Sequence, residues 1–290
     1  MTSQVFLITG ASRGLGRDIV EAALAAGHSV VAGARKPEQL DDFVTRYGSR
    51  IVPVRLDVTD PDAAAAAVRA ATDSFGRLDV VVNNAGYADL ASIEDVTLDD
   101  LRAQIDTNFL GVVNVTKAAL PVLREQGDGH IIQVSSVGGR SASPGLGAYQ
   151  SAKWAVGGFS GVLAAEVGRL GIKVTVLEPG GMRTDWAGSS MAIPAISEPY
   201  DATVGERARA METWIPSGDP AKVAQVVLEI AVMDEPPLRL LLGSDAYRYA
   251  TQIGEIQAAS DHKWRELSQS IDHDEATEAD TDPLAAVNRK

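Results

Sequence analysis

Short runs of apolar residues alternate along the chain with longer segments in which apolar residues recur every three or four positions. Val5–Thr9, Ser29–Ala34 and Ile51–Leu56 are runs of the first kind. Such runs predict buried β-strands. Residues 16–26 show the second pattern, and an Asp-Pro pair at position 60 opens another such segment after the third run. These segments predict helices between the strands.

The alternation continues through the rest of the chain. Four more apolar runs predict strands, at Leu78–Val82, Ile131–Ser135, Lys173–Leu177 and Arg239–Leu242. Strands that alternate with helices and are apolar on both faces are typical of a parallel sheet covered by helices on both sides. We therefore predict an α/β fold with a doubly wound, Rossmann-type parallel sheet of about seven strands in a single domain.

Two segments interrupt this rhythm. Residues 185–218 are rich in proline, glycine and large aromatic residues, and they predict a long irregular loop that serves as a substrate lid. Residues 271–290 are polar and acidic, and they predict a flexible C-terminal tail. We expect residues 1–270 to form the single domain.

Composition narrows the class of protein. Hydrophobic residues make up 45% of the chain and aromatic residues 5%, so the core is expected to be aliphatic. A net charge of -13 argues against a nucleic-acid partner. Neither a signal-peptide pattern nor an apolar run of about 18 residues occurs, so we expect a cytoplasmic protein without a membrane span. Because the chain has no cysteine, disulfides and a thiol nucleophile are excluded, and no metal site is predicted.

A glycine-rich turn lies between the first predicted strand and the first predicted helix. Gly10, Gly14 and Gly16 allow a tight turn and a close approach of a pyrophosphate to the backbone. The helix that follows offers free N–H groups and the positive end of its dipole. The turn in this context predicts dinucleotide binding. Its spacing is Gly-x-x-x-Gly-x-Gly rather than the more common Gly-x-Gly-x-x-Gly.

Three further motifs follow the glycine turn in a fixed order. They are Asn83-Asn84-Ala85-Gly86, Tyr149-x-x-x-Lys153, and Pro179-Gly180 followed by Thr184. With these four motifs, the segment from residue 5 to about 245 resembles the short-chain dehydrogenase/reductase family. The resemblance implies an enzyme that transfers a hydride between a nicotinamide cofactor and a small-molecule carbonyl or alcohol.

Tyr149 and Lys153 form the core of the predicted catalytic site. Their spacing places both side chains on one face of a helix. An ammonium group near the tyrosine lowers its pKa, so that Tyr149 can exchange a proton with a substrate oxygen. The resemblance adds Ser136 and Asn108 as catalytic residues and gives Lys153 a second role on the nicotinamide ribose. Two alternatives remain: Ser135 as a strand-end residue that satisfies backbone groups, and Asn108 as a solvent-facing polar residue.

The resemblance also implies a set of cofactor contacts. They are Gly10, Ser12, Arg13, Gly14, Leu15, Gly16, Arg35, Asp57, Val58, Asn84, Ala85, Gly86, Tyr149, Lys153, Pro179, Gly180, Met182 and Thr184. Ala34 occupies the position where the family's NAD enzymes carry an acidic residue, and Arg35 and Arg13 can bind a 2′-phosphate. We therefore predict NADP as cofactor, with NAD less favoured. Asp57 has a plainer alternative as the cap of the turn that follows it.

The substrate and the partners are less sharply defined by the sequence. Small, apolar and aromatic residues around the predicted pocket favour a hydrophobic carbonyl or alcohol, although Arg140 and Arg183 can anchor an acid group. The resemblance implies a homodimer or homotetramer, assembled through helices at about 101–124 and 149–170. Two alternatives to a dehydrogenase are a catalytically silent NADP(H)-binding regulator and an epimerase or dehydratase of the wider family. The chain keeps Tyr149 and Lys153 and has no large second domain, and both features favour the dehydrogenase.

Overall fold

The computed structural model describes residues 3–184, 191–277 and 280–282. The chain divides into two compact units, Met1–Tyr249 and Ala250–Lys290. The sheet lies in the first unit, and the second contains most of helix α9 (Ser244–Lys263) together with α10 (Arg265–Gln269). Within the described ranges, no helix is long and apolar enough to cross a membrane.

Seven parallel strands form one sheet in the order β3-β2-β1-β4-β5-β6-β7. Their bounds are β1 Val5–Thr9, β2 Ser29–Ala34, β3 Ile51–Arg55, β4 Val80–Asn83, β5 Gly129–Val134, β6 Ile172–Pro179 and β7 Arg239–Leu242. The order reverses between β1 and β4, and ligands of open α/β sheets bind at the carboxyl ends of strands at such a point. The predicted doubly wound parallel sheet is therefore confirmed.

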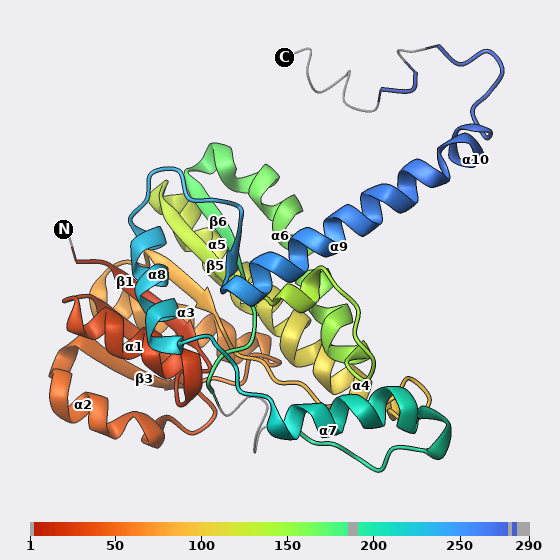
Figure 1. The fold of residues 1–290 in the computed structure, drawn as a ribbon. Coiled ribbons are helices and arrows are strands. Elements are labelled where there is room, and N and C mark those ends of the chain that lie inside the picture. The colour runs from red at the N-terminus through yellow and green to blue at the C-terminus, as the bar shows by residue number, and fades with distance from the viewer. Residues whose placement is uncertain (1–2, 185–190, 278–279, 283–290) are drawn as a thin grey trace. The chain divides into compact units, whose positions relative to one another are not determined.

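Helices cover both faces of this sheet (Figure 1). Helices α1, α2 and α8 contribute to one hydrophobic cluster, and α3, α5 and α6 contribute to the cluster on the opposite face. The bounds in the first unit are α1 Gly14–Ala25, α2 Asp41–Tyr47, α3 Pro61–Phe75, α4 Leu98–Ile105, α5 Gly111–Gln126, α6 Gly147–Val167, α7 Glu206–Thr213 and α8 Pro220–Ala231.

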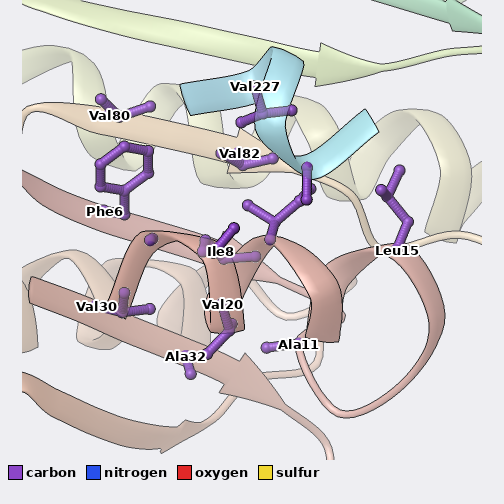
Figure 2. Packing of buried hydrophobic residues seen from close by; sticks show 14 of the residues in the cluster. Phe6, Ile8, Ala11, Leu15, Val20, Val30, Ala32, Val80, Val82 and Val227 are labelled. Atoms are coloured by element: carbon purple, nitrogen blue, oxygen red, sulfur yellow. The ribbon is translucent and has the colours of Figure 1, made fainter. Parts of the chain in front are cut away.

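Aliphatic side chains dominate the core, as the composition predicted. On one face, Phe6 and Ile8 of β1 pack with Val20 of α1 and Val227 of α8 (Figure 2). Successive strand residues point to opposite faces, so Leu7 belongs to the second cluster. Phe6 and Phe43 are the aromatic residues among the largest fully buried side chains.

The predicted lid differs from the structure in its regularity. Residues 191–218 were expected to be irregular, but they include the 3₁₀ turn Glu198–Tyr200, the π-helical turn Asp201–Gly205 and α7. Val204, Ala208 and Met211 recur at helical spacing and pack in one apolar cluster, which explains why this segment is helical. Residues 185–190 of the predicted lid lie outside the described residues.

The predicted lid is tied to the segment after β4 by polar contacts. The Asp95 carboxylate accepts hydrogen bonds from the backbone N–H and the hydroxyl of Ser197, at 3.2 and 3.1 Å. The Tyr200 hydroxyl donates to Glu94 at 2.7 Å. Leu90 N–H donates to the carbonyl of Ala192 at 3.0 Å. These contacts hold residues 192–200 against the segment after β4.

The C-terminal helices were not foreseen from the sequence. Helix α9 continues well past the last strand, and its exposed apolar side chains include Ile256. In α10, Leu267 is likewise exposed. The flexibility of residues 271–290 remains a prediction.

Candidate active site

The glycine turn after β1 is closely packed against the segment after β4. Gly10 and Gly14 have φ angles of +64° and +52°, in the region that favours glycine. A Cβ at Gly10 would lie 2.9 Å from the Cα of Ala85, and a Cβ at Gly16 would overlap the carbonyl oxygen of Gly10. The turn therefore leaves no room for a side chain at Gly10 and Gly16, where it packs on itself and on the segment after β4.

The N-terminus of α1 is left open to a ligand. Arg13 stands at the N-cap position without a side-chain capping bond, and the first turn of α1 holds no acidic residue. By contrast, Asp60 caps α3 and Asp219 caps α8 through their carboxylates. The first N–H groups of a helix need an acceptor, and an anion supplies one. These residues fit the pyrophosphate of a dinucleotide. Ser12 is half-buried beside the turn, and Leu15 is buried in the core.

The other cofactor motifs meet the glycine turn at the same edge of the sheet. Asn84 Nδ2 donates to the carbonyl of Thr9 at 3.0 Å. The backbone N–H groups of Asn84 and Ala85 donate to Thr9 Oγ1, at 3.0 and 2.9 Å. A Cβ at Gly14 would lie 3.6 Å from the Cβ of Thr184. Three motifs that are far apart in the sequence thus meet at one edge of the sheet.

The segment after β6 is held by backbone contacts. Gly180 N–H donates to the carbonyl of Leu242 at 3.0 Å, and Gly181 N–H donates to Asp245 Oδ2 at 2.8 Å. Met182 pairs with Gly218 in a short bridge. The turn after Pro179 is therefore fixed by groups near the start of α9. Sequence reasoning missed Asp245, because no local pattern links it to the turn.

Arg13, in the glycine turn, and Arg35, directly after β2, are exposed, and neither has an ion-pair partner within the described part of the chain. Burial raises the pKa of Tyr87, and the charge of Arg35 opposes that shift. The guanidinium charge of Arg35 therefore influences Tyr87, in the segment after β4. Both guanidinium groups are available to an anionic ligand.

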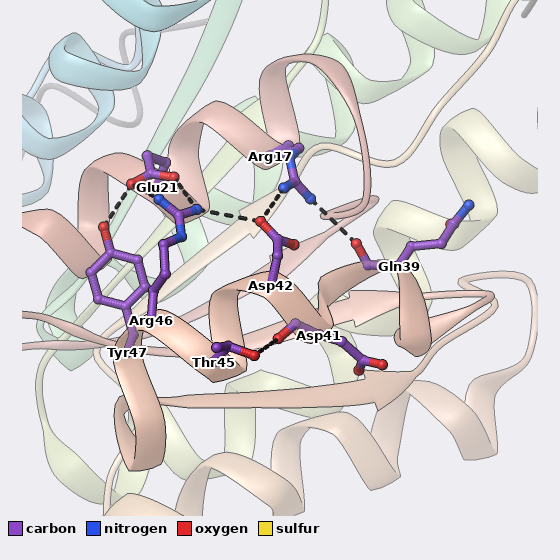
Figure 3. A network of polar contacts seen from close by, with 8 residues as sticks. All are labelled: Arg17, Glu21, Gln39, Asp41, Asp42, Thr45, Arg46 and Tyr47. Atoms are coloured by element: carbon purple, nitrogen blue, oxygen red, sulfur yellow. Dashed lines mark hydrogen bonds and ion pairs between the residues drawn. The ribbon is translucent and has the colours of Figure 1, made fainter.

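Neighbouring arginines on the same side of the sheet are already engaged. Arg17 pairs with Asp42 of α2 (Figure 3). Arg46 pairs with Glu21 of α1 at 2.7 Å, and the Tyr47 hydroxyl donates to the same carboxylate at 2.6 Å. This network joins α1 to α2, and it distinguishes structural arginines from the two unpaired ones.

Asp57 and Val58 follow β3. Asp57 Oδ1 accepts hydrogen bonds from the N–H and the hydroxyl of Thr59, at 3.0 and 2.8 Å, in the manner of a turn cap. Val58 is buried, and its side chain would meet a Cβ placed at Gly111. The carboxylate of Asp57 thus has the plainer role that the sequence left open, and its contact with a cofactor remains a prediction.

Tyr149 and Ser136 lie within hydrogen-bonding contact. Ser136 Oγ also accepts a bond from Gly138 N–H at 3.0 Å, whereas Ser135 Oγ donates to the carbonyl of Lys153 at 3.2 Å. Ser136 is therefore the serine beside the tyrosine. Burial raises the pKa of Tyr149 to about 12, against the smaller, lowering effect of the Ser136 bond. The predicted fall in this pKa is wrong, because burial outweighs the hydrogen bond from Ser136.

Lys153 is buried next to the tyrosine. Its Nζ lies 5.6 Å from the centroid of the Tyr149 ring and donates to the carbonyl of Val134 at 2.9 Å. Burial lowers the pKa of this lysine to about 8. The two residues share one face of α6, as their spacing predicted.

Asn108 completes this group from a π-helical turn, Asp106–Leu110, between α4 and α5. Its Nδ2 donates to the carbonyls of Tyr87 and Gln104, both at 2.8 Å. A Cβ at Gly86 would lie 2.5 Å from Asn108 Oδ1 and 3.6 Å from Lys153 Nζ. The solvent-facing alternative for Asn108 is wrong, since the residue is 0% exposed. Single π-helical turns are frequent at functional sites.

Apolar residues surround the tyrosine. Tyr149 belongs to a third hydrophobic cluster, whose other buried members are Ala88, Leu90, Leu146, Met191 and Val204. The two arginines considered as acid anchors are both engaged. Arg140 pairs with Glu178, and Arg183 Nε donates to the carbonyl of Pro216 at 2.9 Å.

A parallel sheet with a dinucleotide cradle at its reversal point, next to a buried tyrosine, serine and lysine, defines an oxidoreductase of the nicotinamide-dependent class. A family model described as short chain dehydrogenase matches residues 4–192, and the chain belongs to this family. The activity of the family, oxidoreduction at CH–OH and C=O groups, therefore applies to this protein.

Similar proteins agree with this assignment. The chain is 58% identical over 269 residues to the oxidoreductase BOA17 of Botryotinia fuckeliana, covering 92% of this chain and 98% of that protein. A short-chain dehydrogenase from Streptomyces avermitilis has a TM-score of 0.88 at 36% identity, covering 93% and 99% of the two chains. A short chain dehydrogenase from Burkholderia cenocepacia in complex with NADP has a TM-score of 0.73 at 26% identity, covering 90% and 97%.

Proposed function

We propose that this protein is an NADP-dependent oxidoreductase that interconverts a hydrophobic carbonyl compound and its alcohol. The observation that carries the proposal is the hydrogen-bonded pair of Tyr149 and Ser136, with Lys153 buried beside it. When bound, the nicotinamide supplies or accepts the hydride at the substrate carbon.

The residues of the site have separate roles in this proposal. Ser136 donates a hydrogen bond to the substrate oxygen. Tyr149 donates a proton to that oxygen when an alcohol forms, and it takes the proton back in the reverse direction. Because burial raises its pKa to about 12, Tyr149 carries its proton at neutral pH. Lys153 holds the ribose hydroxyls, and Asn108 fixes the backbone that surrounds the lysine.

Two features support NADP over NAD. Arg13 and Arg35 are exposed and unpaired among the described residues, and charge-assisted bonds to a 2′-phosphate suit guanidinium groups. Ala34 leaves no carboxylate at the end of β2 to bind a free ribose hydroxyl. The Burkholderia cenocepacia structure, which is similar over most of this chain, was solved in complex with NADP.

The apolar cluster around Tyr149 supports a hydrophobic substrate. Its described members carry no charge, and the two arginines near the site are held by protein groups. Apolar pockets with a few polar groups bind ligands of matching polarity. We expect ketones and aldehydes with apolar substituents to be turned over faster than acids of equal size.

A spectrophotometric assay with NADPH and NADH against a panel of carbonyl compounds tests the proposal. Tyr149→Phe removes only the hydroxyl, so kcat is expected to fall to about 1% or less, since positioned acids contribute about 10²–10⁴-fold. NADPH affinity should stay within a few-fold. Tyr47→Phe removes a hydroxyl that bonds to Glu21 on α1, and it serves as the control that keeps turnover. Equal turnover in the two variants would remove Tyr149 from the mechanism.

We also infer a homodimer or homotetramer. Gly158 and Gly161 of α6 meet nothing within 4 Å of an added Cβ, and Val162 is 59% exposed. Trp154 is exposed on the same helix. Small residues beside exposed apolar ones suit close contact with a helix of a second copy.

A further inference from the structure

A buried carboxylate lies directly before the turn that follows β6. Glu178 is 1% exposed, and it precedes Pro179. Its Oε1 accepts a hydrogen bond from Arg239 Nη1 at 3.1 Å. Its Oε2 lies 2.6 Å from Arg140 Nη2, as an ion pair outside good hydrogen-bond alignment. One buried negative charge is thus shared by two half-exposed guanidinium groups.

Each partner of Glu178 comes from a different part of the site. Arg140 ends the 3₁₀ turn that begins after Ser136, and its N–H donates to the carbonyl of Val137 at 3.0 Å. Arg239 is the first residue of β7, and its Nη2 donates to the carbonyl of Gly157 at 3.0 Å. Gly157 lies one helical turn after the catalytic lysine of α6.

The contact with α6 is close-packed at a residue without a side chain. A Cβ at Gly157 would lie 3.1 Å from Arg239 Nη2, so a larger residue would require the guanidinium group to shift by a few tenths of an ångström. Glu178 therefore connects three segments through its two arginines: the serine turn, the tyrosine–lysine helix and the turn at Pro179–Gly181.

A buried ion network contributes little net stability, because desolvation of the charges offsets their attraction. The network instead fixes the relative positions of the segments that it joins, because charged groups that each bind several partners do so in only a few geometries. Apolar residues of similar volume would fill the same space with less strict orientation. A shift of about 1 Å in a reacting group can cost about 100-fold in rate.

We propose that Glu178, with Arg140 and Arg239, is a positioning network that sets Ser136 and helix α6 against the nicotinamide-side turn. This inference rests on the proposed function of the site. The network does not touch the substrate; it acts through the backbone of the segments that carry the catalytic groups.

The test compares three variants with the wild-type protein. Glu178→Gln keeps the shape of the side chain but removes its charge. A triple variant, Arg140→Met with Glu178→Leu and Arg239→Met, removes every charge of the network. Asp79→Asn is the matched control: Asp79 is 6% exposed and pairs with Arg77 at 2.6 Å, but it lies at the amino end of β4, away from the site.

We expect kcat to fall about 100-fold in Glu178→Gln, with KM and NADPH affinity within a few-fold. The triple variant should regain thermal stability, because it leaves no unpaired buried charge, but it should not regain kcat. Asp79→Asn should lose stability and keep kcat. A triple variant that regains both quantities, or a Glu178→Gln protein with wild-type kcat, would overturn the positioning role.

Hydrogen exchange separates this inference from the proposed function. The amides of residues 137–141 and of the first turns of α6 should exchange faster in Glu178→Gln than in Asp79→Asn. This comparison holds whether or not a carbonyl substrate is found. Absence of turnover in the wild type would reject the proposed function alone, whereas unchanged exchange in these segments would reject the network.

Discussion

Lys153→Met is expected to make the protein more stable and inactive. Lys153 is 4% exposed, and it has no carboxylate partner within the described ranges. Methionine keeps the length and apolar contacts of the side chain but removes the buried ammonium. Turnover should be lost, because the proposed contact with the ribose and the charge beside Tyr149 are both removed.

The size of the gain follows from the pKa of the lysine. Burial lowers this pKa from 10.5 to about 8, a cost of about 3 kcal/mol when the unfolded chain is the reference. The full cost is present below pH 8, where both states are charged. The cost shrinks between pH 8 and 10.5, where the lysine is neutral in the folded protein but still charged in the unfolded chain. Above pH 10.5 the lysine is neutral in both states, and the cost vanishes. Loss of the bond to Val134 offsets about 1 kcal/mol.

We therefore expect Lys153→Met to gain about 2 kcal/mol in unfolding free energy at pH 7, or roughly 4–8 °C in Tm. Urea unfolding at pH 7 measures the gain in unfolding free energy. At pH 10 the difference between the variant and the wild type should be small, because the wild-type lysine has lost its proton. Lys173→Met is the control, because this half-buried lysine donates a similar bond to Met233 at 3.0 Å. A Lys153→Met protein that is destabilised as much as the control, or a gap that persists at pH 10, would refute the reasoning.

Three further outcomes are expected. Ala34→Asp with Arg35→Val should shift the ratio of kcat/KM toward NADH by at least about tenfold, since 1.4 kcal/mol is a factor of ten; a wild type that prefers NADH would contradict the arginine argument. Val162→Glu should dissociate the oligomer in light scattering, whereas Val44→Glu, on the exposed side of α2, should not. His130 stays neutral in the fold because burial lowers its pKa to about 4, so stability should fall from pH 6.5 to 4 by about 3 kcal/mol. In His130→Gln the urea midpoint should depend less on pH over this range than in the wild type.

The order and type of the elements were predictable because the central strands β2, β1, β4, β5 and β6 are buried on both faces, which makes their sequences almost continuously apolar. Their first residues were less predictable. Leu78 was expected to begin the fourth strand, but its N–H donates to the side-chain oxygen of Gln126, Oε1, at 3.0 Å. The N–H of Val5 donates to the carboxylate of Asp79 at 2.7 Å. Such contacts join residues far apart in the sequence, so a local pattern does not reveal where β4 begins.

The residues of the candidate site also differ in how far the sequence could predict them. Residues within contiguous motifs, such as Asn84 and Lys153, were found because their spacing is local. Glu178 and Asp245 were missed because their partners come from other elements. The pKa of Tyr149 was predicted in the wrong direction, since the number of atoms that bury a hydroxyl is a tertiary property.

Helix α6 shows how the site is built at the expense of local stability. Each interior glycine costs a helix about 1 kcal/mol, and a buried, unpaired ammonium costs more. Lys153 carries that ammonium to the tyrosine, and Gly157 admits the guanidinium of Arg239 to its carbonyl. Gly158 and Gly161 leave open space on the face proposed to meet a second copy. Helix α6 therefore contains destabilising residues at the positions that have a proposed role in the site or in the assembly. This coincidence favours a catalytic function over a structural one.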